Sequence, residues 1–174
     1  MRVFVDTNIV LYALLPDDPR KQALAQELLH RHSRDRSLWL STQVLLEAYS
    51  VLTRKRKLVP ADALAAVQLL ASRQVAPATP EGTLRALALS ARYRLSPWDA
   101  AIVQAAMDAG CETLYTEDLQ DGQHFEALRV VNPFELKVQE TAPLLAAPMS
   151  PVPAKGRAAK VTARGPPAQR KTRP

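Results

Sequence analysis

The 174-residue sequence contains one cysteine, Cys111, and only 5% aromatic residues. A single cysteine excludes an internal disulfide and any metal site built from several cysteines, and it favours a reducing, cytoplasmic setting. No stretch approaches the roughly 18 uninterrupted apolar residues of a membrane-spanning helix. An apolar strand expected directly after Met1 and Arg2 leaves no room for the apolar part of a signal peptide. We therefore expect a protein that is neither exported nor bound to a membrane.

Acidic residues are missing from the last part of the chain. Residues 143–174 contain seven of the 23 lysines and arginines, seven of the 14 prolines and none of the 17 acidic residues. The rest of the chain therefore has a net charge near −1, and the excess positive charge belongs to this tail. We expect one folded domain over residues 1–138 and a disordered basic tail, rich in Pro, Ala, Lys and Arg, over residues 139–174. A solvated extension is favoured over weak attraction to RNA.

Short apolar runs alternate with longer segments that begin with helix caps. Thr79-Pro80 and Ser96-Pro97 each place a capping hydroxyl before a first-turn proline. Strands are expected at residues 3–5, 38–40, 74–76, 112–116 and 129–131. Helices are expected at residues 8–15, 19–34, 43–56 and 60–71, from residue 80, and from residue 97 to about residue 110. Strands separated by helical hairpins predict an α/β fold with a mainly parallel sheet and helices on both faces.

Four acidic residues lie at positions that favour a role in a functional site over a role in folding. Asp6 and Asp118 follow predicted strands, Glu47 interrupts an apolar helix, and Asp99 lies in the first turn of the helix from residue 97. Ligands bind in the crevice beyond the carboxyl ends of the strands in such sheets. Carboxylates that converge there repel each other by roughly 4 kcal/mol per close pair at an effective dielectric constant of 20. A divalent cation would remove this repulsion.

Each of these acids also has a structural explanation. Taken singly, the explanations are a helix cap for Asp6, an ion pair with Arg54 for Glu47, a first-turn charge for Asp99, and initiation of the turn at Asp121-Gly122 for Asp118. For Asp99 alone the structural role is favoured. Chance would rarely supply all four, so their combination favours a site.

Four motifs occur in order along the chain. They are Asp-Thr-Asn at residues 6–8, Glu47, Leu-Ser-Pro-Trp-Asp-Ala-Ala-Ile-Val at residues 95–103, and Tyr-Thr-Glu-Asp-Leu-Gln-Asp-Gly at residues 115–122. Over residues 1–136 they resemble the PIN-domain ribonucleases, particularly the VapC-type toxins of prokaryotic toxin–antitoxin pairs. The last two motifs are the more specific. Pro97 and the basic tail are the chief departures from the family pattern.

The resemblance implies a three-layer α/β/α sandwich and a metal-dependent endoribonuclease. Asp6, Glu47, Asp99 and Asp118 would form the acidic site for Mg²⁺ or Mn²⁺, the cations that oxygen ligands favour. Asp6 and Asp99 are expected as direct ligands, whereas Glu47 and Asp118 would bind a second ion or orient water. The family also implies a cognate antitoxin and a homodimer.

Further residues are expected around this site. Asn8 and Thr116 would orient ligating carboxylates, and Asp121 is either a fifth acid or a turn residue. The basic run is explained by a solvated helix end, with guidance of an RNA backbone as the alternative; it comprises Arg54, Lys55, Arg56 and Lys57. The two tryptophans, Trp39 and Trp98, are expected to pack rather than to stack on bases.

Two other functions remain open. A non-catalytic RNA-binding scaffold would keep the fold and use the acids structurally. A phosphotransfer domain would use Asp6 as acceptor or nucleophile. The second alternative is disfavoured, because Asn8 stands where the haloacid-type signature needs a second aspartate.

Overall fold

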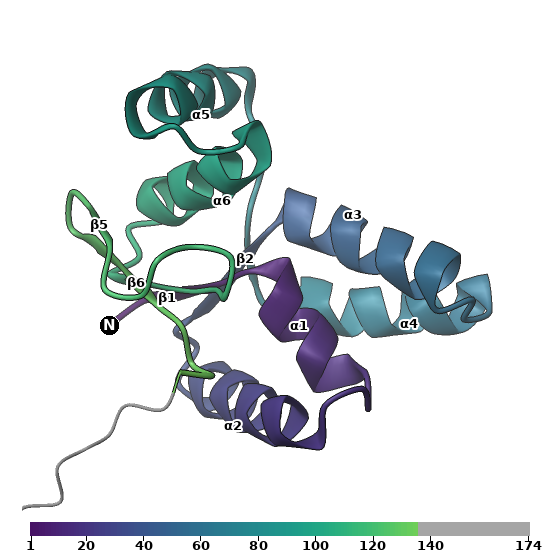
Figure 1. The fold of residues 1–174 in the computed structure, drawn as a ribbon. Coiled ribbons are helices and arrows are strands. Elements are labelled where there is room, and N and C mark those ends of the chain that lie inside the picture. Colours follow the sequence, from purple (N-terminus) through teal and green to yellow (C-terminus); the bar gives the residue numbers. More distant parts are fainter. Residues whose placement is uncertain (136–174) are drawn as a thin grey trace, which may run out of the picture. The chain divides into compact units, whose positions relative to one another are not determined.

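A six-stranded sheet lies at the centre of the fold (Figure 1). The structure is a computed structural model and describes residues 1–135. The tail predicted over residues 139–174 lies outside the described residues, and the domain boundary at residue 138 stays a prediction. The strands are β1 (Val3–Val5), β2 (Leu38–Ser41), β3 (Gln74–Ala76), β4 (Thr113–Tyr115), β5 (His124–Phe125) and β6 (Leu128–Val131). The helices are α1 (Thr7–Leu14), α2 (Pro19–Arg34), α3 (Thr42–Ser50), the π-helical turn η1 (Val51–Lys55), α4 (Pro60–Ala71), α5 (Pro80–Tyr93) and α6 (Pro97–Asp108).

The strand order is β3-β2-β1-β4-β6-β5, and only the β5–β6 pair is antiparallel. In the central strand, Val3 pairs with Leu38 of β2 and Thr113 of β4. All three residues of β1 are fully buried, as expected for a parallel strand covered on both faces. The chain steps from β1 to β2 to β3 and then crosses back to β4. Right-handed crossovers therefore place α5 and α6 on the face opposite α2, as Figure 1 shows. The predicted sandwich is confirmed.

Local signals explain where the helices begin. The side chains of Asp18, Ser41, Thr79 and Ser96 each accept a hydrogen bond from a backbone N–H in the first turn of the following helix. Prolines open α2, α4, α5 and α6, where their missing N–H has no intrahelical partner to lose. The predicted starts at residues 19, 60, 80 and 97 are confirmed.

Two elements differ from the prediction. The helix predicted over residues 43–56 is regular only to Ser50 and then widens into η1, where the Thr53 hydroxyl donates to the Tyr49 carbonyl at 2.8 Å. Single π-helical turns of this kind are frequently found at functional sites. The two-residue strand β5 was not predicted, because a short edge strand carries no periodic signal. It returns to β6 through Glu126, whose φ is 53°.

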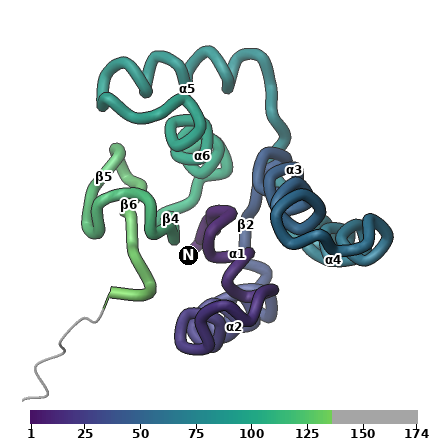
Figure 2. The backbone as a smooth tube through the Cα atoms, turned by 45° about the vertical axis from the view of Figure 1, so that its right-hand side comes forward, coloured from purple at the N-terminus to yellow at the C-terminus, as the bar shows by residue number. Residues whose placement is uncertain are grey.

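The carboxyl edge of the sheet is covered by two helices that start there. α1 begins two residues after β1 ends, and α3 begins directly after β2. Figure 2 shows α1 between α2 and α3, in agreement with Figure 1. Residues at the starts of α1 and α3 therefore lie close to the carboxyl ends of the central strands. Within residues 1–135, no helix has both the length and the apolar character needed to cross a membrane.

Candidate active site

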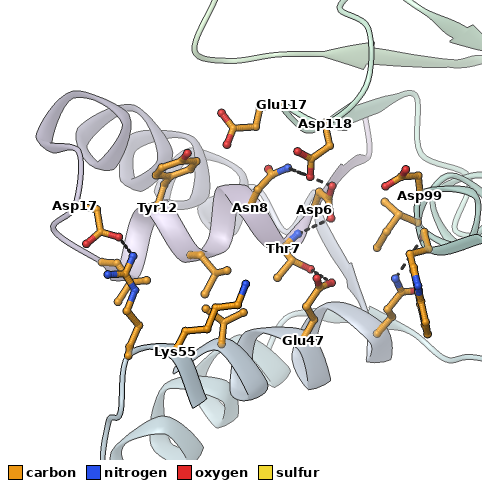
Figure 3. A pocket seen from close by; sticks show the side chains of 17 residues that line it. Asp6, Thr7, Asn8, Tyr12, Asp17, Glu47, Lys55, Asp99, Glu117 and Asp118 are labelled. Carbon is orange, nitrogen blue, oxygen red and sulfur yellow. Dashed lines mark hydrogen bonds and ion pairs between the residues drawn. The ribbon is translucent and has the colours of Figure 1, made fainter. Parts of the chain in front are cut away.

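A cleft of about 530 Å³ opens at the carboxyl ends of β1 and β4, between α1, α3 and the start of α6 (Figure 3). Its lining is strongly acidic. Six carboxylates face it, from Asp6, Asp17, Glu47, Asp99, Glu117 and Asp118, together with the cations of Lys55 and Arg56. The structure thus brings all four predicted acids to one cleft.

Asp6 is the most enclosed of these acids, with 8% of its surface exposed. It caps α1 by accepting from the Thr7 N–H at 2.6 Å, and its Oδ2 accepts from the Thr116 hydroxyl at 2.8 Å. The pKa of Asp6 is raised to about 6, mainly because the carboxyl group is buried, and the charges of Asp118 and Glu47 contribute to this rise. The two hydrogen bonds oppose this shift. The two hydrogen bonds to Asp6 therefore do not fully compensate the cost of burying its negative charge.

Asn8 and Thr116 connect Asp6 to Asp118. Asn8 Nδ2 lies 2.9 Å from Asp118 Oδ2, 3.1 Å from Thr116 Oγ1 and 3.4 Å from Asp6 Oδ2. Thr116 Oγ1 also accepts from the Asp118 N–H at 3.1 Å. Both residues predicted to orient carboxylates therefore contact them. We call Asp6, Asn8, Thr116 and Asp118 the strand wall.

Glu47 lies on the opposite side of the cleft and is exposed. Its Oε2 accepts from the Thr7 hydroxyl at 2.9 Å. Glu47 interrupts the apolar helix without being enclosed by it, because α3 leaves both Glu47 and the neighbouring Leu46 exposed. Its hydrogen-bond partner is Thr7 rather than Arg54. Thr7 itself was not singled out from the sequence, although it stands between the two motif residues Asp6 and Asn8.

Asp99 approaches the cleft from a third direction, the first turn of α6. Ser96 Oγ donates to Asp99 Oδ2 at 2.7 Å and accepts from the Asp99 N–H at 3.1 Å. The helix cap thus also fixes the carboxylate. The preceding residue, Trp98, lines the cleft and is 72% exposed, so the prediction that it packs is wrong. Trp39 is half-buried, with the Arg2 guanidinium carbon 5.5 Å from the centroid of its ring.

The structure divides the predicted basic run. Lys55 and Arg56 line the cleft, whereas Arg54 and Lys57 are exposed and do not line it. In Figure 3 Lys55 and Glu47 extend from η1 and α3 toward Thr7 and Asn8 on α1. Arg56 forms an ion pair with Asp17 across the mouth of the cleft. We call Glu47, Lys55 and Arg56 the helix wall.

Asp121, the possible fifth acid, does not line the cleft. Its Oδ1 accepts from the Asn132 N–H at 2.8 Å and ties the loop after β4 to the end of β6, which is a turn role. A different acid, Glu117, lines the cleft and was missed in the sequence. It pairs with Lys21 at 2.5 Å, and this hydrogen bond is the main reason that the pKa of Lys21 is raised. The one sequence feature that could have indicated Glu117 is its position next to Asp118.

The donor set fits a hard cation. Every acidic side chain at the cleft offers oxygen, and Asn8 Oδ1 is a buried oxygen without a hydrogen-bond partner among the described residues. Over residues 1–135 no three side chains of Asp, Glu, His or Cys are already close enough to hold a metal ion together. Glu47 and Asp118 are exposed, so their side chains are free to rotate in the cleft that also contains Asp6.

Comparison with known proteins defines the class. A model of the PIN domain matches residues 3–124, more than half of the sequence, and the chain belongs to the PIN-domain family. The predicted resemblance is confirmed. No curated protein matches the chain at a significant level.

Solved structures of toxins and toxin–antitoxin complexes have the same fold. VapC20 of Mycobacterium tuberculosis, a toxin that cleaves the sarcin-ricin loop, has a TM-score of 0.55 and 24% identity, with 67% of this chain and 91% of VapC20 covered. A toxin–antitoxin complex from Klebsiella pneumoniae has a TM-score of 0.58 and 21% identity, with 78% of this chain and 100% of the other covered. DNA-bound VapBC from Salmonella typhimurium has a TM-score of 0.56 and 20% identity, with 75% and 96% covered.

Proposed function

We propose that this protein is a divalent-cation-dependent endoribonuclease, the toxin component of a type II toxin–antitoxin pair. One observation carries the proposal: buried Asp6, with its raised pKa, shares a cleft at the carboxyl edge of a PIN-domain sheet with Glu47, Asp99 and Asp118. Bringing these acids together destabilises the fold, but it provides the oxygen ligands that a cation needs. The structural similarity to VapC toxins supports the same conclusion.

The roles follow from the contacts. Asp6 and Asp99 are the direct ligands for Mg²⁺ or Mn²⁺, since hydrogen bonds from Thr116 and Ser96 fix their carboxylates. Glu47 and Asp118 complete the set or orient water. When bound, the cation lowers the pKa of a water molecule and offsets charge on the departing oxygen of the cleaved phosphodiester. Asn8 and Thr116 hold the carboxylates of the strand wall in place meanwhile.

The cationic end of the helix wall binds the RNA backbone. Lys55 and Arg56 reach the cleft that holds the acids, so phosphates on either side of the cleaved bond would contact them. An acidic cleft without such cations would repel RNA. The arrangement therefore supports a nucleic-acid substrate over a small neutral one.

The partners are proposed on similar grounds. A cognate antitoxin would block the acidic cleft, since the fold is shared with toxins solved in toxin–antitoxin complexes. A homodimer through α3 and α4 is supported by large apolar side chains that stay exposed on these helices and the turn between them: Leu46, Val59, Leu64 and Leu69. Their exposed fractions are between 49% and 73%.

Cleavage assays test this function. Purified protein is incubated with structured RNAs in Mg²⁺, in Mn²⁺ and in EDTA, alongside Asp6→Asn and Asp99→Asn. We expect cation-dependent cleavage and losses on the order of 100-fold or more in each variant, the scale on which preorganised charge-stabilising groups act. Asp121→Asn is the matched control and should cleave at the parental rate. Equal cleavage by Asp6→Asn and the parent would refute the assignment, and RNA binding without cleavage would favour a scaffold.

A further inference from the structure

A second hollow adjoins the acidic cleft on the far side of Trp98. It has a volume of about 320 Å³ and lies between α5, α6 and the start of α3. Trp98 and Gln43 line both hollows, so the indole separates them and is accessible from each. α5 and α6, which line this groove, lie side by side (Figure 2).

Trp98 is held in place but left uncovered. Pro97 and the Ser96 cap fix the first turn of α6, and Gln43 Nε2 donates to the Trp98 carbonyl at 3.4 Å. The side chain of Trp98 is 72% exposed, whereas Trp39 is half-buried. An anchored backbone with an exposed indole is suited to stacking against a planar ligand.

The groove has the chemistry of a base-binding site. Its lining includes small apolar residues, Ala86, Ala101 and Ala105, together with the hydroxyl of Thr42 and the amides of Gln43 and buried Gln104. Such groups bind the edges of bases displayed by single-stranded RNA.

The groove is poorly suited to phosphate. Asp108 is the one charged side chain among the described residues that line it. Its two oxygens already accept from Arg85 at 2.7 Å and from Gln104 at 2.9 Å. A neutral, planar group therefore fits this groove better than an anion does.

We propose that the nucleotide next to the cleaved phosphodiester places its base in this groove, stacked on Trp98. This inference rests on the proposed function, since it assigns the substrate's base to a groove that shares Trp98 and Gln43 with that cleft. Trp98 directly precedes Asp99 and lines the same cleft, so a base stacked on Trp98 would adjoin the acidic site. A protein side chain also fits an apolar groove, but the shared Trp98 and Gln43 tie this one to the ligand of the acidic cleft.

The chain's two tryptophans make the test direct. Trp39→Phe leaves Trp98 as the only indole. This variant is titrated in EDTA with a 2′-O-methyl RNA octamer, which resists cleavage, and with an abasic octamer of the same length and charge. We expect the octamer with bases to quench Trp98 emission and the abasic octamer to leave it unchanged. In anisotropy titrations, Trp98→Ala should weaken octamer binding about 5- to 150-fold, and Trp98→Phe should retain most of the affinity.

Controls separate this inference from the nuclease assignment. Leu84→Ala removes another exposed large apolar residue, outside both hollows, and should bind normally. Equal quenching by the abasic octamer, or unchanged binding by Trp98→Ala, would overturn the base site and leave the groove to a protein partner. Base-dependent quenching in a protein that never cleaves RNA would sustain the base site while the nuclease function fails. If Trp98→Ala cleaved RNA with an unchanged KM, the nuclease function would stand and the base site would be overturned.

Discussion

The two walls of the cleft are built in opposite ways. The strand wall is a closed hydrogen-bond network in which Asp6 and Thr116 are buried and Asn8 bridges to Asp118. The helix wall consists of exposed side chains, and Glu47 has one hydrogen bond that crosses the cleft, from Thr7. Buried Asp6 and Thr116 are fixed before any ligand binds, whereas the exposed side chains of the helix wall are free to adjust.

This difference assigns different tasks to the walls. Preorganised oxygens suit a cation, because their desolvation and orientation costs are already included in folding. Exposed cations on flexible side chains suit an RNA backbone, whose phosphates vary in position. Substitutions in the strand wall should therefore change stability and cation affinity. Those in the helix wall should change RNA affinity and its salt dependence.

Asp6→Asn should produce the largest effect and in an unusual direction. The folded-state pKa of about 6 lies above the ordinary value of 3.8, so the protonated form stabilises the fold. This stabilisation is complete below pH 3.8 and is lost as the pH rises through 6. At pH 7.5 in EDTA, Asp6→Asn should raise the free energy of unfolding by about 3 kcal/mol at most, with a much smaller change at pH 4.

Urea unfolding of both proteins at the two pH values measures this effect. Adding Mn²⁺ should stabilise the parent and leave Asp6→Asn unchanged, since the ion compensates the charge only where a carboxylate is present. Asp121→Asn, away from the cleft, tests for a general effect of removing an acid. If Asp6→Asn were the less stable protein at both pH values, the account of a strained strand wall would be wrong.

Thr116→Val should come next in size. The substitution keeps the shape of the side chain but removes the hydroxyl that donates to Asp6 and accepts from Asn8. Losing that donor raises the pKa of Asp6 further and frees its carboxylate to rotate. We expect Mn²⁺ affinity, measured by calorimetry, to fall about 10- to 100-fold.

A second threonine, three residues earlier at the start of β4, provides the control. Thr113 is buried in β4 but does not line the cleft, so Thr113→Val makes the same chemical change outside the network. Its Mn²⁺ affinity should match that of the parent. Equal losses in the two variants would mean that the strand, rather than the hydroxyl, determines the affinity.

The strand wall was also the part of the site that sequence could predict. Asp6 and Asp118 follow apolar strands, and strand ends meet at one edge of a parallel sheet whatever the details of packing. The caps of α2, α5 and α6 also depend only on neighbouring residues, so the predicted starts of these helices were correct. Sequence patterns succeed where a few neighbouring residues determine the outcome.

The helix wall and Trp98 were predictable only in part, because their positions depend on tertiary contacts. The apolar residues around Glu47 did not indicate that α3 leaves its carboxylate exposed. The widening at η1 selects Lys55 and Arg56 from the basic run for the cleft, and no local pattern predicted that widening. Composition alone assigned Trp98 to packing. Its exposure follows from the arrangement of α3, α5 and α6 around it.

Lys55→Gln should have a moderate effect that is confined to RNA binding. The substitution removes one cation from the cleft while keeping a polar side chain of similar length. Affinity for a single-stranded RNA should fall severalfold, and the slope of log affinity against log salt should become shallower by about 0.7 to 1. Stability and Mn²⁺ affinity should stay at parental values.

Lys57→Gln is the matched comparison, two residues away and outside the cleft. It should leave both the affinity and the salt slope close to parental values. If the two lysines behaved alike, RNA would be attracted by the general charge of the η1 region. The proposal that the helix wall binds RNA while the strand wall binds the cation would then lose its support.

Asp17→Asn should have the smallest effect and tests how freely the helix wall moves. Asp17 pairs with Arg56 at the mouth of the cleft, and each side chain is 41% exposed. An ion pair this exposed contributes less than about 1 kcal/mol to stability. Breaking it releases Arg56 for phosphate and removes one negative charge from the path of the RNA. Affinity should therefore rise, by about two- to fivefold, although a native contact has been lost.

Fluorescence anisotropy at low salt measures this gain, and it should disappear at high salt because both contributions are electrostatic. Glu27→Gln breaks a comparable exposed ion pair, that with Arg31 on α2, outside the cleft, and should not change RNA affinity. A loss of affinity in Asp17→Asn would show that the ion pair holds Arg56 in its binding position. The helix wall would then be preorganised like the strand wall, and the contrast between them would hold only for Glu47 and Lys55.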